Sequence, residues 1–233
     1  QIKEALRIHQ GLRGNEATDA AVGLLEDVGI PDPRRRVEEY PHQLSGGMQQ
    51  RAVIAMALAC DPDLLVCDEP TTALDVTIQA QILDLLADLQ REEDLAILFI
   101  THDMGVIEDA TDRVNVIYAG EIVERAPTGT LFSEPAHPYT EALLRSIPGR
   151  TNAAERLPTI EGEVPTPTGR AEDCRFAPRC PYAFAECHEM PPEHVDVGAE
   201  RSAACLLHED GSEEAAERTV FDGSEAVSGG DSA

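Results

Sequence analysis

The stretch LLVCDEPTTALD, residues 64–75, determines the fold that we expect for this chain. It opens with a continuous apolar run, LLVC, which is typical of a strand buried on both faces of a parallel sheet. Asp68 and Glu69 follow at the end of this run, and Asp75 can cap the next helix. A second apolar run, LAILFI at 95–100, comes after that helix. Strand, helix and strand in this order predict a βαβ unit with a right-handed crossover.

Polar side chains follow both predicted strands. Asp68 and Glu69 end the first strand, and His102 comes just after the second. Ligands of open α/β sheets bind at the carboxyl ends of the strands, so we expect these side chains to face one crevice. Asp68 is suited to Mg²⁺, Glu69 could polarise an attacking water, and His102 could hydrogen-bond a terminal phosphate. The simpler alternative is that the two acids only cap the turn before the next helix.

A second candidate phosphate site lies upstream, in LSGGMQQR at 44–51. Ser45 can cap a helix over about 48–59, while Gly46 and Gly47 leave the backbone amides open to an anion that the helix dipole favours. The alternative is a glycine-containing turn into an ordinary helix. The sequence nevertheless contains no G-x-x-x-x-G-K-[ST] phosphate loop.

LSGGMQQR, LLVCDEPTTALD and FITHD, in this order and at these distances, resemble the ATP-binding subunit of ATP-binding cassette (ABC) transporters over about residues 1–126. The resemblance implies an α/β fold: a partial P-loop NTPase-type ABC ATPase domain, with the helical subdomain and the Walker B half of the parallel sheet. It implies ATP and Mg²⁺ as cofactors. The implied roles are the signature for Leu44–Gln49, the Walker B aspartate for Asp68, the catalytic base for Glu69, the D-loop for Ala73-Leu74-Asp75 and the switch histidine for His102.

The resemblance also explains why one half of a phosphate site occurs without the other. In the family two ATPase subunits pair head to tail, and the signature of one completes the phosphate site of its partner. We therefore expect Ser45, Gly46, Gly47, Gln49 and Asp75 to contact nucleotide at such an interface, and Asp68 to bind Mg²⁺ in the chain's own site. The phosphate loop and the Q-loop glutamine lie further upstream in the family. We expect the chain to be an N-terminally truncated subunit that is inactive alone.

The region after residue 130 resembles the extension of oligopeptide and dipeptide importer ATPases. The resemblance implies a second, identical or different ATPase subunit, two transmembrane permeases and an extracellular peptide-binding protein as partners. It places the subunit peripherally on the cytoplasmic side of the membrane. A nickel importer and a soluble ABC ATPase without a permease are the alternatives, although the latter should lack this extension. The segments that carry the resemblance are HPYTEALLRSIP (137–148), EGEVPTPTG (161–169), CRFAPRCPYAFAEC (174–187) and ACLLH (204–208).

Four of the six cysteines crowd into this region with the spacing C-x5-C-x6-C-x17-C. Four thiolates could hold a [4Fe–4S] cluster or a tetrahedral Zn²⁺ ion, and free thiols are the third possibility. The missing C-x2-C clip disfavours zinc, and the resemblance points to the cluster. Cys60 and Cys67 lie in apolar runs and are expected in the core. The candidate ligands are Cys174, Cys180, Cys187 and Cys205.

The charge of the chain restricts its partners. The formal net charge is -26, and Lys3 is the only lysine. We expect no direct nucleic-acid binding, because phosphate contacts need a basic face. An acidic, lysine-poor surface suits a high-salt cytoplasm, so we predict a halophilic source. The alternative is an ordinary acidic protein with an acidic tail, which leaves the lack of lysine unexplained.

Composition and motif order predict four parts. Residues 1–60 form a helical subdomain with the signature, and 61–130 form the Walker B, D-loop and switch part of the core. Residues 131–208 form the transporter-type extension with a small Cys-rich C-terminal domain, and 209–233 form an acidic disordered tail. A β-hairpin is expected at 114–126 around Ala119-Gly120. No apolar run reaches the roughly 18–20 residues that would span a bilayer.

Overall fold

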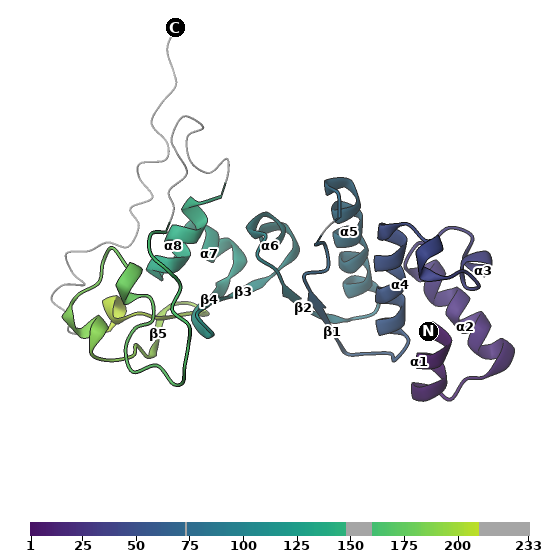
Figure 1. Cartoon of the computed structure of the whole chain (residues 1–233), viewed down its shortest axis with the longest axis horizontal. Helices are drawn as coiled ribbons and strands as arrows, with labels where there is room; N and C mark the ends of the chain where they lie inside the picture. The colour runs from purple at the N-terminus through teal and green to yellow at the C-terminus, as the bar shows by residue number, and fades with distance from the viewer. Residues whose placement is uncertain (73, 148–159, 210–233) are drawn as a thin grey trace, which may run out of the picture. The chain divides into compact units, whose positions relative to one another are not determined.

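The structure, a computed structural model, describes residues 1–72, 74–147 and 160–209 (Figure 1). The chain divides into two compact units, the first from Gln1 to His102 and the second from Asp103 onward. None of the described helices combines the length and the apolar character needed to cross a membrane. From residue 210 on, the predicted tail lies outside the described residues, as does residue 73 of the predicted D-loop.

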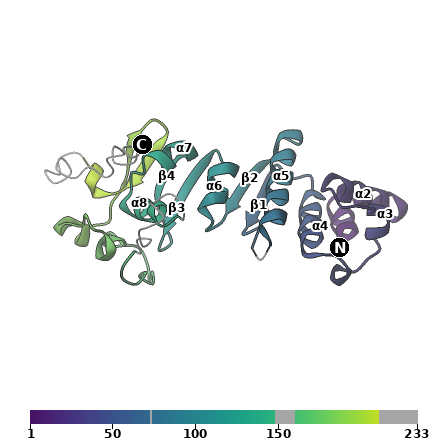
Figure 2. The same cartoon turned by 90° about the horizontal axis from the view of Figure 1, so that it is seen from above.

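The first unit begins with a helical part and continues into the predicted βαβ unit. β1 and β2 pair in parallel, with Leu64 opposite Ala96 and Asp68 opposite Ile100, and α5 connects them, which confirms that prediction. Figure 2 shows the two strands side by side. The elements are α1 (Ile2–His9), α2 (Gly14–Asp27), α3 (Pro33–Arg36), a 3-10 turn (Pro41–Gln43), α4 (Gly46–Leu58), β1 (Leu64–Asp68), α5 (Val76–Glu92) and β2 (Ala96–Ile100).

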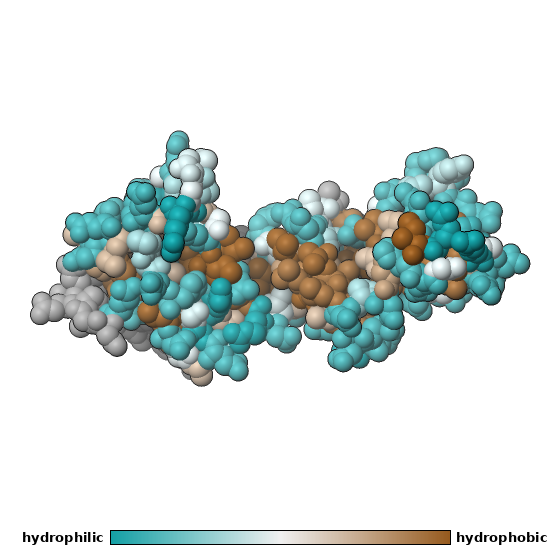
Figure 3. All heavy atoms as spheres, turned by 90° about the horizontal axis from the view of Figure 1, so that it is seen from below, coloured by the Kyte–Doolittle hydropathy of each residue, from teal (hydrophilic) through white to brown (hydrophobic). Residues whose placement is uncertain are grey.

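The prediction that the strands are buried on both faces is wrong. In β1, Leu65 and Cys67 are buried in a core that also contains Ile82 of α5, but their neighbours Leu64 and Val66 are 53% and 55% exposed. The outer residues of β2 are exposed in the same way, and Figure 3 shows apolar side chains gathered over these strands. Within the described residues, helices cover only one face of this sheet. Leu64, Val66, Leu98 and Ile100 therefore form an open apolar face.

The predicted core position of Cys60 is also wrong, because its side chain is exposed. α4 ends at Leu58, and Asp61 adopts a left-handed backbone with φ 51°. The chain thus turns at the end of the apolar run, and Cys60 lies on the turn instead of on the helix. Cys67, in contrast, is buried as predicted.

The second unit contains a four-stranded sheet with the strand order β3-β4-β6-β5. The predicted hairpin is confirmed: Ala119 and Gly120, with φ 46° and 82°, form the two-residue turn between β3 and β4. Positive φ at both positions matches the twist of a hairpin. The elements are α6 (Met104–Ala110), β3 (Arg113–Tyr118), β4 (Glu121–Pro127), α7 (Thr128–Ser133), α8 (Pro138–Arg145), 3-10 turns at Ala177–Arg179, Ala185–His188 and Leu206–His208, β5 (His194–Gly198) and β6 (Arg201–Ala204).

Candidate functional site

Glu69 and His102 meet at the carboxyl ends of β1 and β2. The Nδ1 atom of His102 lies 2.9 Å from Oε1 of Glu69, although the residues are 33 positions apart in the sequence. The backbone N–H of Glu69 also donates to the carbonyl of Ile100 over 2.9 Å, which ties the end of one strand to the other. Both side chains remain open to solvent. The structure thus brings together the acid and the histidine that the sequence placed at one crevice.

Thr72 is a member of this group that sequence reasoning missed. Its hydroxyl donates to Oε2 of Glu69 over 2.7 Å, so the two carboxylate oxygens of Glu69 have different partners. Glu69 itself has φ 46°, a left-handed conformation that is uncommon outside glycine and that is found at functional sites. This turn brings Thr72 back onto the carboxylate. In the sequence, the only indication of this contact is a hydroxyl residue three positions after the glutamate.

The two partners of Glu69 also affect its protonation. The hydrogen bond from Thr72 and then the contact with His102 hold the pKa of the Glu69 carboxyl below its ordinary value. Both contacts favour the ionised form. At neutral pH the group is therefore a carboxylate, which can orient and polarise a water through one of its oxygens.

Asp68 stands beside this pair with an exposed carboxylate. Within the described part of the chain its side chain makes no hydrogen bond or ion pair, and no group of three or more His, Cys, Asp or Glu there could hold a metal ion unaided. Carboxylate oxygens are the ligands that Mg²⁺ prefers, usually one or two of them with waters and phosphate oxygens. A single free carboxylate therefore fits Mg²⁺ held jointly with a nucleotide.

The predicted signature lies at the start of α4. Ser45 is its N-cap, and its hydroxyl oxygen accepts from the N–H of Met48 over 3.4 Å, as the sequence suggested. Gln49, which was expected to contact nucleotide, is engaged locally: its Nε2 donates to the carbonyls of Pro41 over 2.9 Å and Leu44 over 3.1 Å. Gln49 thus stabilises the turn that leads into the signature. α4 itself has 13 residues, which is long enough for a helix dipole at its amino end.

The two glycines of the signature have different surroundings. A Cβ built on Gly46 would have no atom within 4 Å, so this side of the helix end is open. A Cβ on Gly47 would lie 2.8 Å from Cγ2 of Ile78 in α5. Gly47 is therefore required by helix packing, whereas the sequence reasoning had assigned both glycines to phosphate approach. Asp75, one turn before Ile78, accepts from its N–H over 3.0 Å and caps α5.

The four clustered cysteines lie in the second unit. The N–H of Cys174 donates to the carbonyl of Cys187 over 3.0 Å. Burial raises the pKa of the Cys205 thiol to about 12, and the other three thiols add to the rise. Burial also raises the pKa of Cys174. The thiols are thus close enough to influence one another. Among the described residues, however, no group of three or more His, Cys, Asp or Glu side chains could hold a metal ion, so the geometry supports neither the cluster nor zinc.

Two family models match the chain. Residues 2–72 match the ABC transporter model, and residues 123–187 match the C-terminal region of oligopeptide/dipeptide transporters. Over residues 2–72 the chain is thus similar to ABC transporters.

Individual relatives agree with the family models. A protein of Brucella abortus named for peptide import and ATP binding is 52% identical over 192 residues, which cover 82% of this chain and 58% of the relative. A protein of Brucella melitensis with the same kind of name is 52% identical over 212 residues, covering 88% of this chain and 63% of the relative. The chain thus spans about six tenths of the length of these relatives.

A solved structure supports the fold. cbiO1 from Clostridium perfringens, part of the ABC transporter complex cbiONQ, is similar with a TM-score of 0.51 and 27% identity. The similarity covers 57% of this chain and 52% of cbiO1. The α/β ABC ATPase fold expected from the sequence is thereby confirmed, and the small Cys-rich domain is not tested by it.

Proposed function

We propose that this chain is part of the ATP-binding and ATP-hydrolysing subunit of an ABC importer for oligopeptides or dipeptides. The observation that carries the proposal is the 2.9 Å contact between Glu69 and His102 at the ends of two parallel strands, next to the free carboxylate of Asp68. Capping alone would explain Asp68 and Glu69. It would not explain a histidine from the next strand held against the glutamate.

In this proposal each side chain acts on a bound ATP in its own way. Asp68 helps to hold the Mg²⁺ that accompanies the phosphates, and such an ion neutralises charge on them. Glu69 orients the attacking water through its carboxylate, while Thr72 and His102 fix the direction of that carboxylate. His102 is well placed to donate a hydrogen bond to a terminal phosphate and to report its presence.

The signature at Ser45–Gly47 serves a second ATPase subunit in the same proposal. Two features support an anion there: the capped amino end of α4 and the open side of Gly46. The contact between Gly47 and Ile78 joins this helix to α5, which begins after Asp75. The two elements that face a partner subunit are therefore packed against each other.

Two transmembrane permeases and an extracellular peptide-binding protein complete the proposed importer, with this subunit bound to the cytoplasmic side of the membrane. The match at 123–187 and the relatives named for peptide import support peptide as the cargo. The nickel alternative is not favoured, since the described relatives are named for peptide import. A soluble ATPase without a permease does not account for the extension.

ATP turnover in the complete subunit tests the proposed roles. We expect Glu69→Gln to lower turnover about 100-fold or more while ATP still binds, because the water loses its carboxylate. His102→Ala should lower turnover about tenfold or more. Glu26→Gln, an exposed glutamate at the end of α2, is the matched control and should leave turnover unchanged. Normal turnover in Glu69→Gln would remove the assigned mechanism.

This chain should not hydrolyse ATP alone, because its sequence has no phosphate loop to hold the β- and γ-phosphates. The measurement is phosphate release by the purified chain with Mg²⁺ and ATP. Turnover that disappears in Glu69→Gln would contradict this expectation. Turnover that persists in that variant would indicate a contaminating enzyme.

The iron–sulfur cluster stays a proposal for the four cysteines. Its support is the clustering of four mutually influencing thiols in one short region. Anaerobic purification of the complete subunit, followed by iron, sulfide and zinc analysis, is the test. About four irons per chain and a brown colour would support the cluster. Folded protein without metal, in which all four thiols react with a thiol reagent, would exclude it.

A halophilic origin is likewise proposed from charge alone. A net charge of -26 with one lysine predicts strong self-repulsion at low salt. Screening by KCl should raise the melting temperature of the complete subunit up to molar concentrations. A melting temperature that stays flat or falls with KCl would argue for an ordinary acidic protein.

A further inference from the structure

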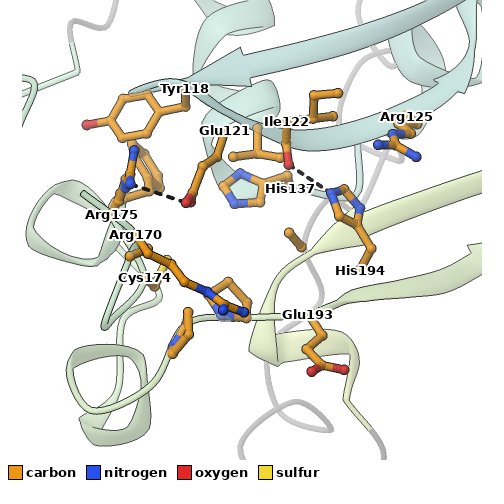
Figure 4. Close-up of a pocket in the computed structure, with 16 residues that line it drawn as sticks. Tyr118, Glu121, Ile122, Arg125, His137, Arg170, Cys174, Arg175, Glu193 and His194 are labelled. Atoms are coloured by element: carbon orange, nitrogen blue, oxygen red, sulfur yellow. Dashed lines mark hydrogen bonds and ion pairs between the residues drawn. The ribbon is translucent and has the colours of Figure 1, made fainter. Parts of the chain in front are cut away.

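The second unit contains a pocket of about 390 Å³ that none of the proposed ATPase chemistry uses. Such a volume suits a small organic molecule. Its walls come from the β3–β4 hairpin, from the segment around residues 170–176 and from the start of β5 (Figure 4). Ile122, Pro191, Pro192 and Ala204 supply apolar surface to it.

His137 lies in the wall of this pocket and is only 2% exposed. It is the first residue of the HPYTEALLRSIP segment at 137–148. Its backbone N–H donates to the buried carboxylate of Glu124 over 2.9 Å, and its Nδ1 accepts from the N–H of Tyr139 over 3.0 Å. The position and the ring orientation of His137 are therefore fixed by the protein.

The other ring nitrogen of His137 is a donor without a described acceptor. Burial lowers the pKa of His137 to about 3, so the ring is neutral. Because Nδ1 accepts a hydrogen bond, the proton of the neutral ring is on Nε2. Among the described residues, no group accepts a hydrogen bond from Nε2. Nε2 is also absent from the set of described polar atoms that are both inaccessible to solvent and without a partner. Nε2 thus retains contact with open space, and the pocket is the open space that His137 lines.

The charges around the pocket favour an anion, which is unusual in a chain with a net charge of -26. Arg175 pairs with Glu121 at 3.3 Å and donates to the carbonyl of Gly169 over 2.6 Å. Arg125 and Arg170 have no acceptor within the described residues. Counting Arg125, Arg170 and Arg175 against Glu121 and Glu193, the pocket lining has one net positive charge, histidines aside.

We propose that this pocket binds a small organic monocarboxylate with an apolar side chain, whose carboxylate accepts from Nε2 of His137 and pairs with Arg170. One net positive charge matches a monoanion. The apolar walls match a hydrophobic body, and the volume exceeds that of a bare inorganic anion. The site lies entirely within the second unit and is independent of the ATPase proposal.

Calorimetry on the full chain with three probes tests the recognition chemistry. N-acetyl-leucine carries the carboxylate and an apolar side chain, N-acetyl-leucine amide lacks the charge, and inorganic phosphate lacks the apolar body. We expect N-acetyl-leucine to bind at micromolar to millimolar concentrations and the other two to bind at least tenfold more weakly. Equal affinity for the amide or for phosphate, or no binding of N-acetyl-leucine by folded protein, would overturn the proposal.

Two variants and one control locate the site. Arg170→Gln should weaken N-acetyl-leucine binding about tenfold or more, because a charge-assisted hydrogen bond is lost. Arg13→Gln removes another exposed arginine that has no described acceptor and lies outside the pocket, so it should not change affinity. His137→Phe should abolish binding if it folds. In the unmodified chain, the NMR signal of the His137 Nε2 proton should shift with N-acetyl-leucine and not with its amide. Unchanged affinity in Arg170→Gln, or an unshifted proton, would refute the assignment.

Discussion

Replacing Glu124 with glutamine should destabilise the second unit far more than an ordinary glutamate substitution. Glu124 is completely buried in β4. Its Oε1 accepts from the N–H of Ala136 over 2.8 Å, and its Oε2 accepts from the N–H of His137 over 2.9 Å. The carboxylate thus satisfies two buried backbone donors at the entry to α8. A glutamine has nearly the same shape but offers only one acceptor atom.

The size of the effect follows from this count. One hydrogen bond to a charged acceptor, worth about 1.5–3 kcal/mol, becomes a bond to a neutral acceptor. The other is lost, and the amide nitrogen of glutamine then faces a backbone N–H, which leaves a buried donor unsatisfied at about 1–3 kcal/mol. We expect the free energy of unfolding to fall by about 2–4 kcal/mol.

Urea denaturation of Glu124→Gln, followed by a probe in the second unit, measures this loss. Glu163→Gln is the control, because Glu163 is exposed and makes no side-chain bond within the described residues. That control should change stability by less than about 0.5 kcal/mol. If Glu124→Gln is as stable as the control, the buried carboxylate does not hold the entry to α8, and the geometry of His137 would need another explanation.

Three further predictions concern stability. Gly47→Ala should lower the free energy of unfolding by about 1–3 kcal/mol, because the new methyl group overlaps Ile78. In a chain that already carries Ile78→Ala, the same Gly47→Ala change should leave the free energy of unfolding measured with denaturant nearly unchanged. Asp75→Ala should lower the free energy of unfolding by about 1 kcal/mol, because it removes the cap of α5. Asp75→Asn should keep most of the stabilisation from the cap in the same assay. His137 has a folded pKa near 3, below its ordinary value near 6.5, so the unfolded chain binds one more proton between these values. Its contribution to stability should be complete above about pH 6.5 and fall by about 1.4 kcal/mol per pH unit below it, and the slope of urea stability against pH should be correspondingly smaller in His137→Phe.

The β1–α5–β2 unit could be predicted because its signals are local. A short apolar run followed by acids, a capping Asp75 and a second apolar run need no knowledge of distant residues. The pairing of Glu69 with His102 was also predictable, since both follow adjacent parallel strands. The exposure of one face of that sheet was not, because periodicity indicates which residues avoid water without indicating what covers them.

The second unit was harder to predict for a different reason. The register between β3 and β4 shifts between Val116 and Ile117, so Val123 and Glu124 are both buried although they are adjacent. A strict alternation would have placed one of them outside. The role of Glu124 depends on this irregularity and on the backbone of Ala136, neither of which is encoded in a local motif.

The open apolar face on β1 and β2 affects how copies of the isolated chain associate as the salt concentration changes. At low ionic strength, its net charge of -26 keeps copies apart even though Leu64, Val66, Leu98 and Ile100 are accessible. Molar salt shortens the range of that repulsion to a few ångströms and strengthens the attraction between apolar surfaces. A rise in KCl concentration should therefore promote association between molecules through this face. Light scattering should rise with salt for the isolated chain, and Leu98→Lys should suppress that rise without changing the fold.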